Sequence, residues 1–286
     1  MQLKNYVSVS IAVLMIMTIS SCSKPAVEKN IGLQLYSVRD AMKADVPSTV
    51  MAVGEMGYKF VEAAGYGDGK FYGMAPADFK ALVEKSGMQF LGSHAGQGLP
   101  DSASWEATMV WWDNAIAAHK EAGVKWIVQP WMGTEGYTSL DGLKKYCDYF
   151  NAVGEKCNAA GISFGYHNHD KEFSKIDSTV IYEFMLENTD PAKVMFQLDL
   201  YWITIGGGDP IAYFDKYPGR FQLYHVKDEK ELGGAETMMN FEPFFAAADK
   251  AGMKNYIVEV ERYSFDPLVS VQKSIEFLNA AAYITK

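Results

Sequence analysis

Residues 162–169 read ISFGYHNH and residues 194–202 read VMFQLDLYW. Both are short, mainly apolar runs that end in polar side chains, which is typical of buried strands. Six similar runs start at Gly32, Phe60, Gln89, Lys125, Phe221 and Tyr256. The starts of all eight runs lie roughly 27 to 37 residues apart, with helical periodicity between them. The pattern predicts one βα unit repeated eight times.

Glycine marks the ends of several predicted helices, at Gly57, Gly87, Gly123, Gly161 and Gly252. Glycine after a last helical turn adopts the left-handed conformation without a Cβ clash. Apolar strands that alternate with helices imply a parallel sheet covered by helices, and eight units predict closure into a single-domain (β/α)8 TIM barrel. An open doubly wound sheet is disfavoured, because the first strand runs into YSVRD without a glycine-rich phosphate loop.

The N-terminal segment differs from the rest of the chain. Lys4 precedes an uncharged apolar run over 6–19, which is shorter than the roughly 20 residues of a membrane-spanning helix. The run ends in Ser20, Ser21 and Cys22, which resembles a bacterial lipobox, and a secretory signal with an incidental cysteine is the alternative. We expect a lipoprotein signal peptide over 1–21, lipidation of Cys22, a tether over 22–30 and a barrel over 31–286. The protein would then be anchored to the bacterial envelope, facing the periplasm.

Composition limits the partners of this chain. The 286 residues carry a net charge of −9, and Lys and Arg form no cluster beyond pairs, so we expect no nucleic-acid partner. Cys147 and Cys157 fall in one predicted helix, about 15 Å apart, which is too far for a disulfide. We therefore expect buried free thiols and a small ligand, and a homo-oligomer is compatible with this composition.

Polar residues occupy the last positions of predicted strands five to eight, where barrel enzymes keep their active sites. A carboxylate inside an apolar strand needs a cation or good hydrogen-bond donors to offset its desolvation. Imidazoles and carboxylates from neighbouring strands suit Mn, Co, Fe or Zn better than calcium, and a salt-bridge layer around Lys227 is the alternative. The strand-end residues are His167, His169, Asp199, His225, Lys227, Glu259 and Glu261.

Several motifs together resemble the sugar phosphate isomerase/epimerase family with a xylose isomerase-like TIM barrel. They are GLQLYSVRD, VEAAGYG, GSHAG, GYHNHDKEF, QLDLYW, PGRFQLYHVKD and IVEVER, and the combination of YHNH with HVKD is the specific part. The resemblance implies one divalent metal ion, Mn, Co, Mg or Zn, held by His167, Asp199, His225 and Glu259. Strand alternation places His167 and His169 on one face, so it leaves open which of the two faces the metal.

The chain departs from the better-known epimerases of this family at two positions. Those enzymes have a glutamate where His167 stands and a histidine where Trp202 stands, and they move a proton with two metal-bound glutamates. Because only Glu259 is kept, two-base epimerisation is less favoured. The YHNHDKEF motif is closer to a dehydratase-like branch of the family.

The resemblance implies an enzyme that removes a proton next to a carbonyl of a small carbohydrate. We expect a metal-dependent isomerase or epimerase, and the alternative is a keto-sugar or keto-glycoside lyase or dehydratase. The base would be Glu259 or His169, with Lys227 as a cation or proton donor. Sugar phosphates are scarce outside the cytoplasm, so we expect an unphosphorylated or keto-bearing substrate.

Five residues at or near strand ends are candidates for contacts with the substrate, although packing inside the barrel explains each of them equally well. A carbohydrate-binding protein without turnover is less favoured, because pure binding needs no Lewis acid. A DNA-repair nuclease is opposed by the acidic charge of the chain. The five residues are Gln34, Glu62, His94, Trp131 and Trp202.

Overall fold

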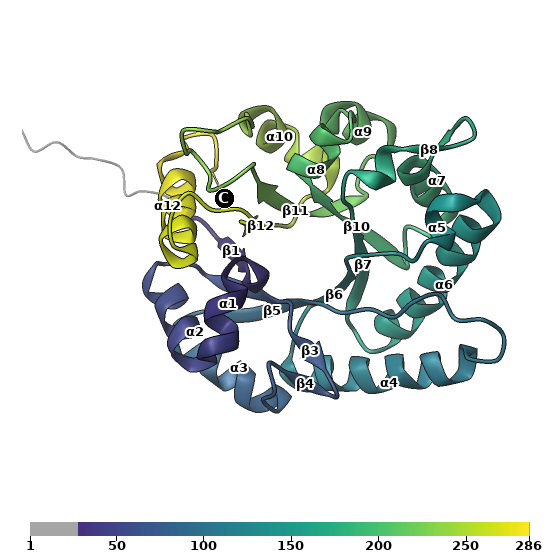
Figure 1. Ribbon diagram of the computed structural model, residues 1–286, viewed down its shortest axis with the longest axis horizontal. Helices are drawn as coiled ribbons and strands as arrows, with labels where there is room; N and C mark the ends of the chain where they lie inside the picture. The colour runs from purple at the N-terminus through teal and green to yellow at the C-terminus, as the bar shows by residue number, and fades with distance from the viewer. Residues whose placement is uncertain (1–27, 286) are drawn as a thin grey trace, which may run out of the picture.

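The computed structural model describes residues 28–285, so the predicted signal peptide, Cys22 and most of the tether lie outside the described residues. Eight parallel strands close into a barrel, which confirms the predicted (β/α)8 TIM barrel in one domain. Figure 1 shows these strands as a central ring with the helices outside it. Within 28–285, the search for a helix long and apolar enough to span a bilayer finds none.

The strand order around the ring follows the chain, and the last strand pairs with the first. The barrel strands are β1 (Ile31–Gln34), β2 (Phe60–Ala63), β5 (Gln89–His94), β6 (Trp126–Gln129), β7 (Ser163–His167), β10 (Val194–Asp199), β11 (Phe221–Lys227) and β12 (Asn255–Glu259). The helices are α1 (Arg39–Ala44), α2 (Val46–Glu55), α3 (Pro76–Lys85), α4 (Trp105–Ala122), α5 (Glu135–Thr138), α6 (Leu140–Ala159), α7 (Ile181–Asn188), α8 (Leu200–Ile205), α9 (Pro210–Lys216), α10 (Glu242–Ala246), α11 (Ala248–Ala251) and α12 (Pro267–Ala280).

Most of the barrel strands are shorter than the runs that the sequence predicts, and two of them lead directly into a helix. The first ends at Gln34, where the 3-10 helix η1 (Leu35–Val38) begins, and the sixth ends at Asp199, where α8 begins. In both places the last strand residue caps the next helix, because its side chain accepts hydrogen bonds from the first backbone N–H groups. The predicted strands over 32–38 and 194–202 were therefore too long.

The glycine pattern and the two thiols agree with the sequence predictions. Gly57, Gly87, Gly123, Gly161 and Gly252 all have positive φ angles, from 77° to 98°. At Gly252 a Cβ atom would also lie 2.7 Å from the Cα atom of Gly219, so the position has no room for a side chain. The free thiols of α6 are both buried, and burial raises the pKa of each to about 12.

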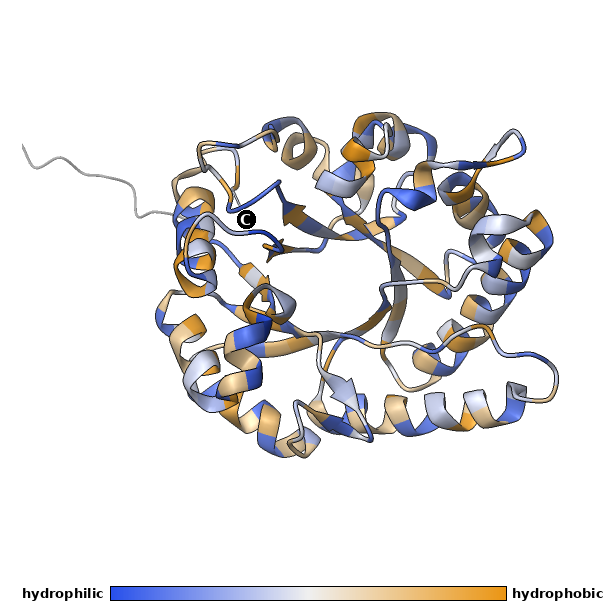
Figure 2. Ribbon diagram, viewed as in Figure 1, coloured by the Kyte–Doolittle hydropathy of each residue, from blue (hydrophilic) through white to orange (hydrophobic). Residues whose placement is uncertain are grey.

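The barrel interior is apolar at its N-terminal end and polar at its C-terminal end. A cluster of buried apolar side chains fills the lower interior, and a larger one lies between the strands and the helices. Figure 2 shows the apolar colours gathered on the strands and on parts of the surrounding helices. On β10, Met195 belongs to the lower cluster. Because side chains alternate along a strand, Gln197 and Asp199, which follow Met195 by two and four residues, also point inward. The lower cluster consists of Phe60, Trp126, Val128, Met195, Leu223 and Ile257.

Candidate functional site

A cavity of about 520 Å³ opens where the barrel strands end. Its aromatic walls come from Tyr36, Tyr66 and Trp131. Ionisable groups reach it from several strands or from the residues just after them, namely His94, His167, His169, Glu259 and Glu261. This is the end of the barrel at which the sequence predicts the active site.

The four predicted metal ligands meet at the base of this cavity. His167, Asp199, His225 and Glu259 each offer one ligand atom, and these atoms all lie within 4.8 Å of one another. One residue comes from each of β7, β10, β11 and β12, and all four are buried. The structure places His167 rather than His169 in this cluster, whereas His169 lies beyond the end of β7 and lines the cavity.

Two buried atoms of the cluster have no hydrogen-bond partner among the described residues, namely Nδ1 of His167 and Oδ2 of Asp199. The other carboxylate oxygen of Asp199 accepts hydrogen bonds from the backbone N–H groups of Tyr201 and Trp202, at 2.9 and 2.8 Å. Since buried polar atoms nearly always have a partner, these two atoms have the character of ligand atoms for a bound cation. The mixed nitrogen and oxygen set fits a divalent cation.

Burial and charge shift the pKa values of the cluster in opposite directions. Burial raises the pKa of Asp199 to about 8, although the Lys227 ammonium opposes the shift. Burial acts against a charged His225, but Glu259 and Glu62 raise the pKa of this imidazole to about 10. Burial lowers the pKa of His167 well below its usual value. A bound cation would offset the desolvation of the Asp199 carboxylate.

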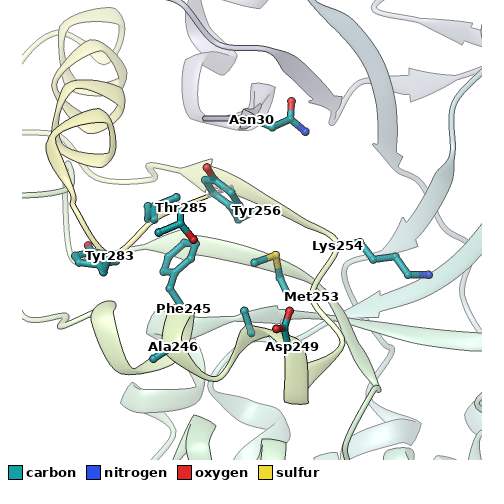
Figure 3. Close-up of a pocket in the computed structure, with 11 residues that line it drawn as sticks. Asn30, Phe245, Ala246, Asp249, Met253, Lys254, Tyr256, Tyr283 and Thr285 are labelled. Atoms are coloured by element: carbon teal, nitrogen blue, oxygen red, sulfur yellow. The ribbon is translucent and has the colours of Figure 1, made fainter. Parts of the chain in front are cut away.

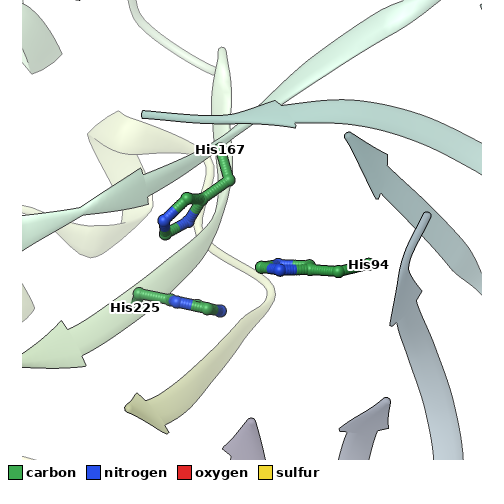
Figure 4. A group of neighbouring side chains, drawn as sticks. All are labelled: His94, His167 and His225. Carbon is green, nitrogen blue, oxygen red and sulfur yellow. The ribbon is translucent and has the colours of Figure 1, made fainter. Parts of the chain in front are cut away.

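Three histidines from different strands converge in the barrel, and two of them, His167 and His225, belong to the cluster. The ligand atoms of His94, His167 and His225 also lie within 4.8 Å of one another. Figure 4 shows the three rings, which come from β5, β7 and β11 and point toward one another inside the barrel. The rings of His94 and His225 stack at 5.4 Å with an angle of 13° between their planes. His94 therefore borders the cluster and the cavity at once.

Gln34 and Glu62, two of the predicted substrate-contacting residues, are not among the residues that line the cavity. Both are fully buried beneath the cavity, and Gln34 donates to Glu62 over 2.8 Å. The Gln34 carbonyl oxygen accepts from the N–H of Tyr36, so both ends of the amide bind other protein groups. Both side chains are thus bound by other protein groups, and contact of either with substrate stays a prediction.

The remaining predicted residues surround the cluster. Lys227 is 2% exposed, and its ammonium lies 5.4 Å from the ring centre of Trp202 and 3.5 Å from a carboxylate oxygen of Glu261. The ring of Trp202 lies 5.9 Å from that of His169, so Trp202 packs against a residue of the cavity wall. Trp131, by contrast, is 43% exposed and lines the cavity mouth. Of the salt-bridge layer that is the alternative to a metal site, the structure shows the Lys227–Glu261 pair and the contacts of His225 with Glu62 and Glu259.

Sequence reasoning missed two groups that organise the site. Gln197 donates to Glu62 and contacts His94 at 2.7 Å, and its place two residues before Asp199 was a usable signal. Glu172 accepts from the hydroxyl groups of Tyr137 and Tyr166 and from the backbone N–H of His169. Glu172 lies in a short 3-10 turn, η2 (Lys171–Phe173), where no strand periodicity marks it as inward-facing.

A second cavity, of about 510 Å³, lies at the opposite end of the barrel, near the start of β12. Figure 3 shows Tyr256, Phe245 and Met253 around it, with Asn30 and the C-terminal residues nearby. Its described lining contains one acid and one lysine, Asp249 and Lys254, and no histidine. A metal-ligating cluster comparable to that of the upper cavity is absent from the described residues of this lining. The upper cavity is therefore the candidate site.

Comparison with protein families agrees with this architecture. The model of the xylose isomerase-like TIM barrel family matches residues 50–281. The chain belongs to the xylose isomerase-like TIM barrel family. A solved member, a sugar phosphate isomerase/epimerase from Parabacteroides distasonis, is 34% identical and has a TM-score of 0.83. The similarity covers 90% of this chain and 99% of that one.

Other proteins that are similar to this chain are more distant. Inosose dehydratase from Lacticaseibacillus casei is 22% identical over 157 residues, which are 46% of this chain and 52% of the dehydratase. The chain thus spans about half the length of the curated relatives it matches. The solved IOLI protein, which binds a zinc atom, is 13% identical with a TM-score of 0.68, and covers 90% of this chain and all of that one. This last similarity shows the fold alone.

Proposed function

We propose that this protein is a divalent-metal-dependent isomerase or epimerase of an unphosphorylated or keto-bearing carbohydrate. The observation that carries the proposal is the four-residue cluster with its two unsatisfied buried atoms, on His167 and Asp199. When bound there, a divalent ion supplies Lewis acidity to a sugar carbonyl and thereby acidifies the neighbouring C–H bond. Membership in a family with isomerase/epimerase and dehydratase relatives supports an enzyme of this kind.

Other side chains near the cluster would transfer the proton, supply a positive charge and contact the sugar. His169 lines the cavity without belonging to the cluster, so it is free to take a proton from a bound sugar. Glu259 is the less favoured base, because its Oε2 atom lies 3.2 Å from Nδ1 of His225 within the cluster. Lys227 holds a positive charge beside the carboxylates and next to the Trp202 ring. Tyr36, Tyr66 and Trp131 offer ring faces that pack against sugar C–H groups.

The lining of the cavity favours a neutral substrate. Among the described residues that line it, none is Lys or Arg, whereas Glu259 and Glu261 are both present. Phosphate groups are held in proteins by Arg, Lys or clusters of backbone N–H groups. A phosphorylated sugar would therefore meet repulsion without a compensating cation at this wall.

The metal content of the purified protein tests the proposal. Asp199→Asn keeps an oxygen that can cap α8, yet it removes the negative charge and one ligand oxygen, so we expect metal content to fall to background. Asp209→Asn is the matched control, because Asp209 caps α9 in the same way and is exposed. Elemental analysis that finds equal metal in wild type and Asp199→Asn would refute the ion site. Turnover that survives exhaustive chelation would refute the metal dependence.

A lyase or dehydratase is the second candidate function. It is favoured by the imidazole of His167 within the cluster, which leaves Glu259 as the one glutamate there, and by the dehydratases among the relatives. Incubation with candidate sugars in heavy water separates the two. An isomerase returns sugar that carries deuterium on carbon, whereas a lyase or dehydratase releases a fragment or water and leaves an unsaturated ketone.

The location of the protein is a separate proposal. We infer from the sequence alone that Cys22 carries a lipid anchor at the bacterial envelope, with the barrel facing the periplasm. Labelling of cells with an alkyne fatty acid should mark the wild type and spare Cys22→Ala. Labelling of both, or of neither, would refute the anchor at this residue.

A further inference from the structure

Glu62 on β2 is a buried carboxylate at the centre of the barrel, directly below the ion-binding cluster. It has no solvent exposure, and five side chains surround it with nitrogen atoms. The contacts run from 2.6 to 3.2 Å and come from Gln34, Trp126, Gln197, His94 and His225. A carboxylate surrounded by this many N–H donors is ionised, because a protonated acid would turn one oxygen into a competing donor.

An ionised carboxylate decides which nitrogen of a neighbouring imidazole carries the proton. The Nε2 atom of His225 lies 2.9 Å from Oε1 of Glu62, so Nε2 must donate. Nδ1 faces Oε2 of Glu259 at 3.2 Å, and this contact needs a positive charge between the two atoms, either a proton on Nδ1 or a bound divalent ion. With Nε2 held as the donor to Glu62, Nδ1 is the nitrogen that would bind the ion. Ligand atoms bound at about 2.1 Å to one divalent ion have a similar separation.

His94 meets Glu62 in the same way on the cavity side. Its Nε2 atom lies 3.0 Å from Oε1 of Glu62 and 2.7 Å from Oε1 of Gln197. Because Gln197 donates its own amide N–H to Glu62, its carbonyl oxygen is turned toward His94 and accepts. Nδ1 of His94, a residue that lines the cavity, is then the nitrogen without the proton.

We propose that Glu62 is a positioning residue that fixes the tautomers of His225 and His94, and thereby tunes the affinity of the cluster for its ion. The proposal rests on the proposed function, since it gives Glu62 a role toward the bound ion. Carboxylates behind a ligating imidazole raise its basicity and hold the ring in place, and their loss costs roughly 10- to 100-fold in metal affinity.

Zinc titration of the purified protein against a competing chelator tests the affinity. We expect Glu62→Gln to raise the zinc dissociation constant by about 10- to 100-fold, because an amide offers one acceptor oxygen and turns an N–H group toward the other donors. Glu231→Gln is the matched control, since Glu231 is a carboxylate with 3% exposure that accepts from Ser264 and Ser270. The control should bind zinc like the wild type.

A second measurement needs no substitution at Glu62 and so remains informative if that variant fails to fold. Long-range ¹H–¹⁵N spectra of the zinc-loaded wild type should show protons on Nε2 of His225 and His94, assigned with His94→Gln. Unchanged zinc affinity in folded Glu62→Gln, or a proton on Nδ1 of His225, would overturn the role of Glu62. A wild type that binds no divalent metal would instead refute the proposed function, and this result differs from both of the others.

Discussion

The early and late strands of the barrel both bury polar side chains, but they satisfy them differently. On β1, β2 and β6, Gln34, Glu62 and Gln129 are fully buried, and each is hydrogen-bonded to other protein groups. On β7 and β10, His167 and Asp199 are equally buried, yet each keeps one atom without a partner among the described residues. Burial alone therefore does not distinguish these two groups of residues, whereas the unsatisfied atoms do, and the proposed ion site rests on them.

The largest expected effect concerns His119, and it tests whether every buried polar atom without a partner belongs to a functional site. His119 in α4 also has an unpaired Nε2 atom, and burial lowers the pKa of this imidazole to about 4. The folded state then favours neutral His119, so its stability is complete above the unfolded pKa of about 6.5 and falls as the pH drops toward 4. At 1.36 kcal/mol per pKa unit the loss reaches about 3 kcal/mol.

Urea unfolding of wild type and His119→Leu between pH 7 and pH 4 measures this loss. The wild type should become less stable relative to the variant as the pH falls, and its zinc affinity at pH 7 should equal that of the variant. A stability difference that does not change with pH would contradict the structural role. Altered zinc affinity in His119→Leu would show that the unpaired Nε2 atom of His119 also contributes to ion binding.

Ion binding should stabilise the late strands and so sharpen the contrast between the two regions. A ligand at 100 times its dissociation constant stabilises the native state by about 2.7 kcal/mol. In a chain of this size, such a gain corresponds to a rise in Tm of about 5 to 10 °C. Thermal unfolding of chelator-treated protein with and without zinc checks the effect. An equal rise in Asp199→Asn would show that zinc binds elsewhere.

Substitution of Asp199, a ligand with an unsatisfied oxygen, should raise the free energy of unfolding when no metal is bound. Asp199→Asn retains an oxygen to cap α8 and replaces a desolvated carboxylate by a neutral amide, so we expect a gain of about 1 kcal/mol in unfolding free energy without metal. Glu62→Gln should instead destabilise the metal-free protein, since its partners lose an acceptor. Urea unfolding at pH 7 compares them, and the same sign in both would remove the distinction between the two regions.

The smallest expected effect lies at the cavity mouth. Trp131 is 43% exposed, so Trp131→Ala should change the unfolding free energy by no more than about 0.5 kcal/mol. Binding of the eventual sugar substrate should weaken nonetheless, because the indole forms part of the cavity wall. Calorimetric titration, with Trp105→Ala as an exposed control outside the cavity lining, measures the difference. Equal sugar affinity in both variants would exclude Trp131 from the binding site.

The sequence predicted the fold and the candidate site best where strand periodicity and side-chain chemistry indicate the same residues. The eight apolar runs and the glycines after helices predicted the barrel, and the polar strand ends together with the family resemblance led to His167, Asp199, His225 and Glu259. The same rule did not indicate that Gln34 and Glu62 are fully buried, because a strand end gives the direction of a side chain but not its depth in the barrel. It also missed Glu172, which reaches the site from a turn, where neither strand nor helix periodicity applies.

Asp199 combines two tasks, since one of its oxygens caps α8 and the other is free at the cluster. Capture of an ion by the free oxygen would therefore be transmitted to the first turn of that helix, where the Trp202 indole is placed beside the Lys227 ammonium. We therefore expect the fluorescence emission of Trp202 to change when the ion binds, so ion binding can be followed without a substrate.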